Sequence, residues 1–285
     1  MTAALATQKT TEPGRDSEFG FVAADFERVR KLIYQRAGIS LHAGKQAMVY
    51  SRLSRRLREL GHTSAGDYLH WLEQAQGAAA DQEWQEFINC LTTNLTSFFR
   101  EDHHFPVLAA ELTKRKGGKQ RIWCNAASTG EEPYSIAMTV LDTLGPQAAV
   151  RVVCSDIDTK VLAQAKRGVY PDDARGLSAE MLKRHFMRGV GGNSGSIRVM
   201  PDLTRLLEFR PFNLMDASWS LGEPFDIVFC RNVMIYFDAP TQRRVLERMH
   251  RVLCPNGLLF AGHSENFNES RDLFRLRGKT VYERV

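Results

Sequence analysis

The chain has 285 residues, of which 43% are hydrophobic and 25% charged, a composition that excludes a fibrous or largely disordered protein. Its length favours one large domain with a smaller companion, and no stretch approaches the roughly 18 consecutive apolar residues of a membrane span. The net charge of +5 favours an acidic partner, which nucleic acid and an acidic protein surface would both satisfy.

The first part of the chain divides into a tail and a helical segment. Residues 1–20 lack the apolar core of a signal peptide, so we expect a disordered tail. Residues 21–93 have helical periodicity throughout and predict an N-terminal all-helical domain. We expect its first two helices to stop at Gly38 and Gly61, because glycine favours a helix C-terminus.

From residue 106 to the C-terminus, short apolar runs alternate with amphipathic helices. The predicted strands are 121–127, 150–155, 225–230 and 257–261, and the predicted helices between them are 132–142, 160–166 and 241–253. This alternation is typical of an α/β fold with a mostly parallel sheet covered on both faces. Because crossovers are right-handed, a doubly wound sheet is the simplest topology.

Two segments depart from this rhythm. An insertion at about 172–204 contains a helix-like stretch and then two short arms around a glycine-rich turn, which predict a small β-subdomain built as a hairpin. The chain ends in a second predicted hairpin at 274–285, turning at Gly278.

The ends of the first two predicted strands indicate a cofactor site. In an open α/β sheet, ligands bind at the carboxyl ends of the strands, beside the change in strand order. The first strand leads into Ala-Ala-Ser-Thr-Gly-Glu-Glu-Pro at 126–133, and the second ends at Asp156. A carboxylate there is the usual acceptor for two ribose hydroxyls, so we expect Asp156 to bind a nucleoside.

The charge of the 126–133 turn favours one class of cofactor. The turn lacks the Gly-x-Gly-x-x-Gly fingerprint, and Glu131 and Glu132 would repel a pyrophosphate. They would tolerate S-adenosylmethionine, which carries an amino group and a sulfonium. On these residues alone the alternative remains that both glutamates only stabilise a helix N-terminus.

Three segments together resemble the chemotaxis receptor glutamate O-methyltransferases, the CheR family. They are LTTNLTSFFR at 91–100, the turn at 126–133, and FCRNVMIYF at 229–237, and the similarity extends over about 26–282. The resemblance implies a class I, Rossmann-like S-adenosylmethionine-dependent methyltransferase domain at 106–285. It also implies the helical domain, the inserted β-subdomain and a linker at 94–105 that contacts the cofactor.

The resemblance also implies residue roles. In the linker, Asn94, Thr96 and Arg100 would close over the cofactor. The rest of the implied cofactor site comprises Glu131, Asp156, Asn213, Leu214, Arg231 and Asn232. Arg100 is our first choice to hold a substrate carboxylate, with Arg231 second. Tyr236 would lie beside the transferring methyl group, unless it is only a core aromatic.

The implied reaction forms γ-methyl esters on glutamates of methyl-accepting chemotaxis receptors. Arg52, Arg55 and Arg56 share a face of the second predicted helix, and this basic face would dock the glutamate-rich receptor helices, unless it is only a solvated face. The β-subdomain would pair with a C-terminal tether peptide of a receptor. We expect a cytoplasmic monomer, recruited to membrane receptor arrays through the receptors, without membrane insertion and without nucleic acid.

Two other functions remain open from the sequence. The basic composition would suit a nucleic-acid methyltransferase. However, Arg-Asn-Val-Met at 231–234 replaces the Asn/Asp-Pro-Pro-aromatic sequence typical of nucleobase methylation. A non-catalytic protein that binds S-adenosylmethionine as a regulator is the second alternative.

We expect no metal, because the eight histidines show no ligand-like spacing. The five cysteines include no Cys-x-x-Cys pair and fit a reducing compartment.

Overall fold

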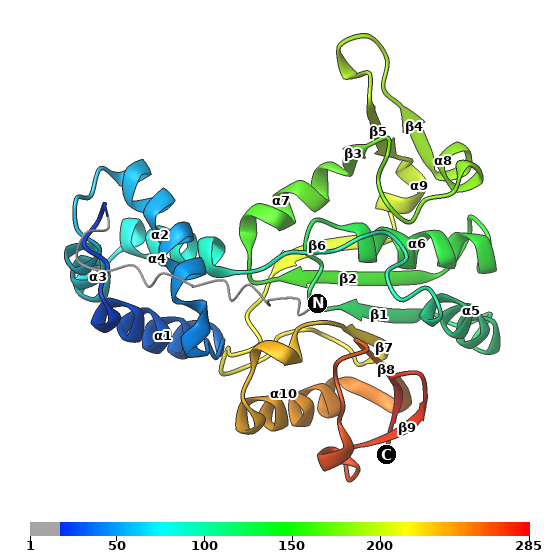
Figure 1. Cartoon of the computed structure of the whole chain (residues 1–285). Coiled ribbons are helices and arrows are strands. Elements are labelled where there is room, and N and C mark those ends of the chain that lie inside the picture. The colour runs from blue at the N-terminus through cyan, green and yellow to red at the C-terminus, as the bar shows by residue number, and fades with distance from the viewer. Residues whose placement is uncertain (1–17) are drawn as a thin grey trace, which may run out of the picture. The chain divides into compact units, whose positions relative to one another are not determined.

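The computed structural model describes residues 18–285 and divides into two compact units, one ending at Leu91 and the other beginning at Thr92 (Figure 1). Of the predicted tail, residues 1–17 lie outside the described residues, whereas Phe19 is buried and its carbonyl accepts a hydrogen bond from Ala65 N. Within 18–285, no helix combines the length and apolar character that a bilayer crossing demands.

The first unit is all helical. Its elements are α1 (Ala23–Ala37), a short 3-10 turn (Ala43–Lys45), α2 (Gln46–Leu60), α3 (Ala65–Gln74) and α4 (Ala78–Leu91). The first two long helices end at Gly38 and Gly61, as predicted, with φ of 71° and 73°. This left-handed conformation strains residues with a Cβ, so glycine suits both ends.

The second unit is an α/β domain. Its elements in chain order are α5 (His104–Lys114), β1 (Gln120–Cys124), α6 (Glu131–Leu144), β2 (Val150–Asp156), α7 (Thr159–Arg167), β3 (Val169–Pro171), α8 (Ala179–His185), β4 (Phe186–Arg188), β5 (Ser196–Val199), α9 (Pro201–Thr204), β6 (Leu207–Pro211), β7 (Phe225–Cys230), α10 (Ala239–Val252), β8 (Leu253–Ala261), β9 (Phe274–Gly278) and β10 (Val281–Arg284). Single-turn 3-10 segments lie at Gly191–Asn193, Met234–Tyr236 and Asn268–Ser270.

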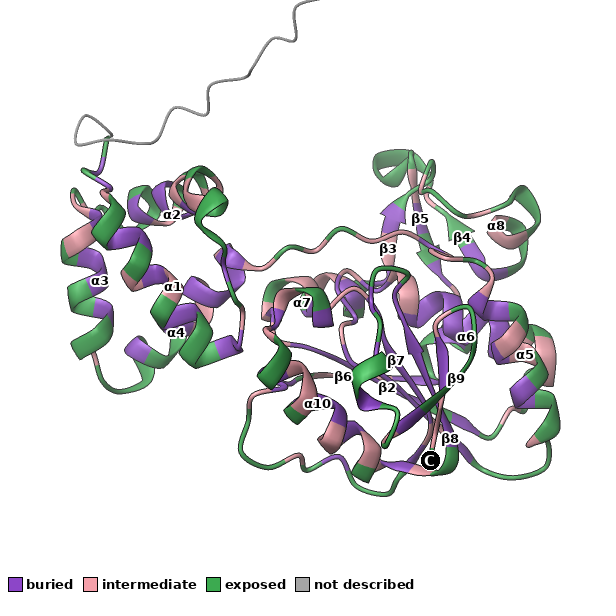
Figure 2. Ribbon diagram, turned by 60° about the horizontal axis from the view of Figure 1, so that its bottom comes forward, coloured by how far each residue is buried: buried purple, intermediate pink, exposed green. Residues whose placement is uncertain are grey.

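The main sheet has seven strands in the order β6-β2-β1-β7-β8-β10-β9, with β10 antiparallel to its neighbours. Side chains alternate between its faces: Ile122 packs in the cluster that holds α5 and α6, and Trp123 packs in the cluster that holds α10. The central strands β1, β2 and β7 are mostly buried (Figure 2), whereas β6 is half-exposed and β9 is largely exposed. The expected doubly wound α/β fold is thus confirmed, and the strand order changes between β1 and β7.

Three sequence predictions of secondary structure were wrong. The first strand ends at Cys124 and not at residue 127, because the chain turns away after it. The edge strand β6 was not predicted. The insertion is a three-stranded sheet in the order β3-β5-β4, not a two-stranded hairpin. Strands as short as Val169–Pro171 contain too few residues for a period-2 pattern to emerge.

The extra strand β3 also supports the turn after β1. Tyr170 of β3 donates a hydrogen bond from its hydroxyl to Thr129 O at 2.8 Å. Gly130 has φ of 102°, and a Cβ there would lie 2.5 Å from the same hydroxyl and 3.1 Å from the Ala165 Cα. Only glycine satisfies both the backbone angle and the lack of space. The small sheet therefore fixes the start of α6.

Candidate active site

The carboxyl ends of β1, β2 and β7 meet at one edge of the sheet, and Asp156 lies there at the last position of β2. Its Oδ2 accepts a hydrogen bond from Ser128 N at 2.8 Å, and its Oδ1 accepts one from Asp158 N at 2.9 Å. Burial raises the pKa of Asp156 to about 6, although these backbone donors favour the charged form. The carboxylate retains lone pairs for a ligand's hydroxyl groups.

Glu131, which is half-buried, is the second carboxylate beside the strand ends. It is the first residue of α6, and its Oε2 accepts a hydrogen bond from Thr129 Oγ1 at 2.6 Å. Burial raises its pKa. Within residues 18–285, neither Glu131 nor Asp156 forms an ion pair with a lysine or arginine. Such carboxylates fit the amino group and ribose hydroxyls of S-adenosylmethionine, and they oppose a phosphate-bearing cofactor.

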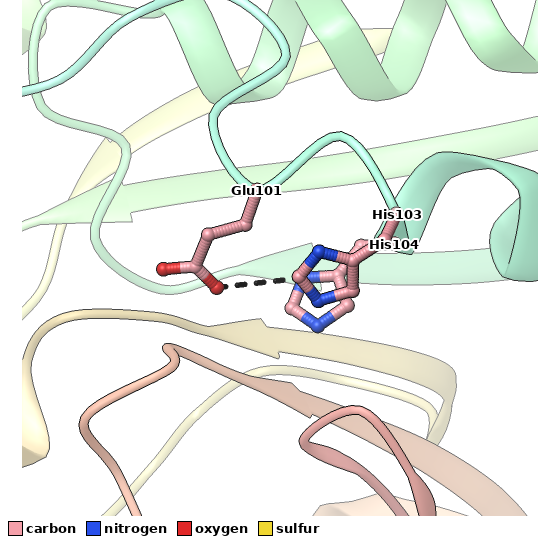
Figure 3. A group of neighbouring side chains, drawn as sticks. All are labelled: Glu101, His103 and His104. Carbon is pink, nitrogen blue, oxygen red and sulfur yellow. Dashed lines mark ion pairs between the residues drawn. The ribbon is translucent and has the colours of Figure 1, made fainter.

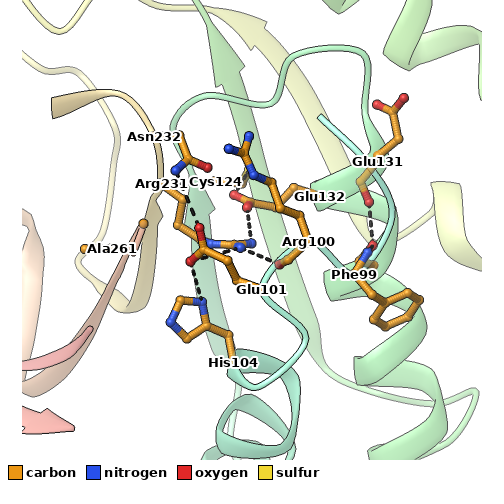
Figure 4. Close-up of polar contacts among 12 residues, drawn as sticks. Phe99, Arg100, Glu101, His104, Cys124, Glu131, Glu132, Arg231, Asn232 and Ala261 are labelled. Carbon is orange, nitrogen blue, oxygen red and sulfur yellow. Dashed lines mark hydrogen bonds and ion pairs between the residues drawn. The ribbon is translucent and has the colours of Figure 1, made fainter. Parts of the chain in front are cut away.

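Glu132 has a different environment from its neighbour, because it pairs with Arg231 (Figure 4). The Arg231 side chain is 1% exposed; its Nη1 lies 2.5 Å from Glu132 Oε2, and its Nη2 lies 3.4 Å from Glu101 Oε2 and donates to Arg100 O. The sequence predicted a shared role for Glu131 and Glu132. The structure leaves Glu131 for a ligand and uses Glu132 to neutralise a buried cation.

Glu101, His103 and His104 lie together in a group that resembles metal ligands (Figure 3). Burial raises the pKa of Glu101, but a hydrogen bond from His263 and the Arg231 charge lower it to about 2. Burial and the same arginine lower the pKa of His104 to about 4, so its ring is neutral near pH 7. Because the fixed Arg231 charge lies 3.4 Å from Glu101 Oε2, we assign the group to an ion-pair network.

The loop after β7 is held by Glu265, a residue that the sequence did not indicate. Its carboxylate accepts four backbone hydrogen bonds, from Asn232 N (3.0 Å), Val233 N (2.8 Å), Met234 N (2.7 Å) and Gly262 N (2.5 Å). Asn232 has φ of 60°, which needs such support. Glu265 thereby fixes the path of the segment that leads to Tyr236.

The linker lies against the ends of β1 and β2. Asn94 donates from Nδ2 to Asp158 Oδ2 at 2.8 Å, and its carbonyl accepts from Ser128 Oγ at 3.2 Å. Thr96 is half-buried. Arg100 donates from Nη1 to Leu95 O at 2.9 Å. These contacts bring the predicted linker residue Asn94 beside the residues that flank Asp156.

The other predicted site residues fall into three groups. Asn213 and Leu214 follow β6, close to Asp156 because Phe212 N donates to Asp156 O at 2.9 Å. Asn232 and Tyr236 follow β7, and the Tyr236 hydroxyl has no hydrogen-bond partner in the described chain. Arg52, Arg55 and Arg56 belong to α2 of the helical unit. Their individual roles stay predictions.

Comparison with known proteins identifies the two units. Residues 24–92 match the model of the CheR methyltransferase all-alpha domain, and residues 94–283 match that of the CheR methyltransferase SAM binding domain. A chemotaxis protein methyltransferase of Klebsiella aerogenes is 56% identical over 262 residues, 91% of this chain and 89% of that protein. The Escherichia coli protein of that name is 53% identical over 91% of this chain and 90% of its own length.

A third relative, chemotaxis protein methyltransferase 2 of Pseudomonas aeruginosa, is 51% identical over 94% of this chain and 95% of its own length. The fold, the site and the matched cofactor domain define an S-adenosylmethionine-dependent methyltransferase. The expected cofactor is thus confirmed. The chain belongs to the CheR methyltransferase family, as its three sequence segments predicted.

The raised pKa of Asp156 predicts how cofactor affinity depends on pH. Ribose hydroxyls bind the ionised carboxylate, so binding must release a proton wherever Asp156 is protonated. As pH falls below about 6, affinity for S-adenosylhomocysteine should therefore fall by up to about tenfold per pH unit. Calorimetric titration between pH 5 and 7.5 measures this. Asp156→Asn should bind weakly with a flatter profile, and constant wild-type affinity down to pH 5 would contradict the assignment.

The buried ion pairs of Arg231 predict a large loss of stability when its charge is removed. Arg231→Met leaves Glu132 and Glu101 without their cation and should lower the free energy of unfolding by about 3–5 kcal/mol. Arg151→Met is the matched control, because Arg151 pairs with Glu208 at an exposed site, and it should cost less than about 1 kcal/mol. Urea denaturation compares them, and equal losses would argue against the network.

Proposed function

We propose that the protein transfers the methyl group of S-adenosylmethionine to glutamate side chains of chemotaxis receptors, forming γ-methyl esters. The family and the names of the three relatives support methylation in chemotaxis. The observation that carries the proposal is the pair of carboxylates at the strand ends, buried Asp156 and half-buried Glu131. Neither has a cationic partner in the described chain, which suits a donor with an amino group and ribose hydroxyls.

The chemistry demands little of the protein beyond alignment. When bound, S-adenosylmethionine supplies a methyl group activated by a sulfonium. A glutamate carboxylate, with an ordinary pKa near about 4.3, is already ionised at neutral pH, so no general base is needed. The residues around the strand ends would orient the two groups and exclude water, which favours a reaction between opposite charges.

Arg100 is the better of the two guanidinium groups for the substrate carboxylate. The Arg231 guanidinium already contacts Glu132, Glu101 and a backbone carbonyl, and its side chain is buried. Arg100 is half-buried, and within the described part of the chain its side chain makes a single hydrogen bond, to Leu95 O. We therefore assign substrate binding to Arg100. The uncommitted Tyr236 hydroxyl would help to position the reacting carboxylate.

Receptor docking on α2 would depend on Arg55 rather than on all three predicted arginines. Arg56 bonds Glu83 and Glu59, and Glu83, 5% exposed, also accepts from the Tyr68 hydroxyl at 2.7 Å. Arg52 donates to Leu91 O at 2.7 Å. Arg55 is exposed and has no ion-pair partner among residues 18–285. Its charge is available to a glutamate-rich helix.

The β-subdomain would bind a receptor tether peptide by strand addition. Its short strand β4 lies at one edge of the β3-β5-β4 sheet, and Met187 on that strand is 43% exposed. An edge strand has backbone groups free to pair with an extended peptide. Recruitment to membrane receptor arrays would then come from the receptors themselves.

Radiolabelled S-adenosylmethionine and receptor-containing membranes test the proposed function. The wild-type protein should transfer label to receptor protein, and mild base should release it, because methyl esters hydrolyse there. Label that enters RNA instead would support the nucleic-acid alternative. No transfer to any glutamate-rich receptor, with intact cofactor binding, would favour a non-catalytic adaptor.

The matched comparison in the same assay is Arg100→Ala. Loss of the guanidinium should lower methyl transfer at least about tenfold, the effect of one charged hydrogen bond, while the thermal unfolding temperature changes little. Full transfer by this variant would remove Arg100 from the mechanism.

Charge reversal on α2 separates docking from folding. Arg55→Glu should raise the KM for receptor at low salt, and the effect should shrink as salt screens the charge. Arg56→Glu should instead destabilise the helical unit, because it places a second carboxylate beside buried Glu83. Arg251→Glu, at an exposed arginine of α10 without a partner among the described residues, changes the net charge equally. An equal rise in KM for Arg251→Glu would contradict docking by Arg55.

A further inference from the structure

Asp158 is a buried carboxylate that no predicted role explains. It lies two residues after Asp156, in the turn between β2 and α7, and is 2% exposed. Its Oδ1 accepts hydrogen bonds from Lys160 N at 2.9 Å and Val161 N at 3.2 Å. One oxygen therefore caps the N-terminus of α7, which is a common structural use of aspartate.

The other oxygen binds Thr92 and the linker residue Asn94, both more than sixty residues away in sequence. Asp158 Oδ2 accepts from Thr92 Oγ1 at 2.7 Å and from Asn94 Nδ2 at 2.8 Å. A helix cap needs only one oxygen, so these two bonds are additional to the cap. Hydrogen bonds to a buried carboxylate are stronger than those between neutral groups.

These bonds complete a closed ring of hydrogen-bonded residues that includes Asp156, the carboxylate proposed to bind the cofactor. Asn94 O accepts from Ser128 Oγ at 3.2 Å, and Ser128 N donates to Asp156 Oδ2 at 2.8 Å. Asp156 Oδ1 accepts from Asp158 N at 2.9 Å, and Asp158 Oδ2 returns to Asn94. The linker is thus attached on both sides of Asp156, to the turn after β1 and to the turn after β2.

We propose that Asp158 is a positioning residue that latches the linker beside Asp156 and thereby slows release of S-adenosylmethionine and S-adenosylhomocysteine. When Thr92 and Asn94 are bound to Asp158, the linker stays against the two turns that carry the cofactor carboxylates. When they are released, water reaches these turns and the cofactor leaves sooner. The latch rests on the cofactor part of the proposed function and is independent of the receptor part.

Asp158→Ser separates the latch from the helix cap. Serine is as good a cap as aspartate, but its single, shorter-reaching hydroxyl does not serve the cap and the linker together. The variant should therefore keep the cap of α7, and its unfolding temperature should fall less than that of Asp158→Ala, which removes the cap as well. It should release S-adenosylhomocysteine about tenfold faster in stopped-flow displacement, the effect of one charge-assisted hydrogen bond. Its KM for S-adenosylmethionine should rise with little change in kcat.

Thr92→Val tests the same latch from the linker side without touching a predicted cofactor residue. It should also speed release, and in the Asp158→Ser background it should add nothing, because both changes break one interaction. Unchanged release from Asp158→Ser, or full additivity of the two variants, would overturn the latch alone. Failure of the wild-type protein to bind S-adenosylhomocysteine would overturn the cofactor site and the latch with it.

Discussion

The site depends on one arrangement that costs desolvation free energy. The Asp156 carboxylate is buried at the end of β2, with no cation beside it in the described chain. Burial alone would neutralise the carboxylate, and three backbone N–H groups, those of Ser128, Ile157 and Asp158, favour its charged form. The turn after β1, the linker and the turn after β2 are all attached to it directly or through one residue. A ligand that donates hydroxyl groups relieves this free-energy cost, and the ribose of S-adenosylmethionine is such a ligand in the proposed site.

The charged side chains near Asp156 have different partners, and few of them share the same contacts. Glu131 is left for the cofactor, whereas its neighbour Glu132 neutralises Arg231, which in turn holds the Arg100 carbonyl. The same region contains four non-glycine residues with positive φ, namely Phe99, Glu101, Ser128 and Asn232. Such conformations persist only where the surroundings fix them, and Glu265, with four backbone hydrogen bonds, does so for the loop after β7. Glu265 thus fixes the path of the loop after β7, and hydrogen bonds with Asp158 and Ser128 fix the linker residue Asn94.

Prediction from sequence succeeded where the signal was local. Helix stops at Gly38 and Gly61, the apolar runs of β1, β2 and β7, and the acidic turn all follow from neighbouring residues. It failed for β3 and β6, which are short or half-exposed and have no clear periodicity. Asp158 and Glu265 were missed for another reason. Each is a single acidic residue after a strand. Some of its partners, such as Thr92 for Asp158 and Asn232 for Glu265, lie more than thirty residues away in the chain.

The sequence by itself determined the family, the α/β class, the position of the cofactor turn and the charge that excludes a phosphate. These properties depend on composition and spacing within segments of about ten residues, which the chain presents whatever its fold. Only the tertiary structure decided which acidic and basic side chains form ion pairs with one another. Glu132 and Arg231, or Arg56 and Glu83, are as prominent in the sequence as Glu131 and Arg55. In the folded chain each of the first two couples forms an ion pair, whereas Glu131 and Arg55 form none with other described residues. Pairing depends on distance in space and on desolvation, and neither exists until the strands and helices have packed.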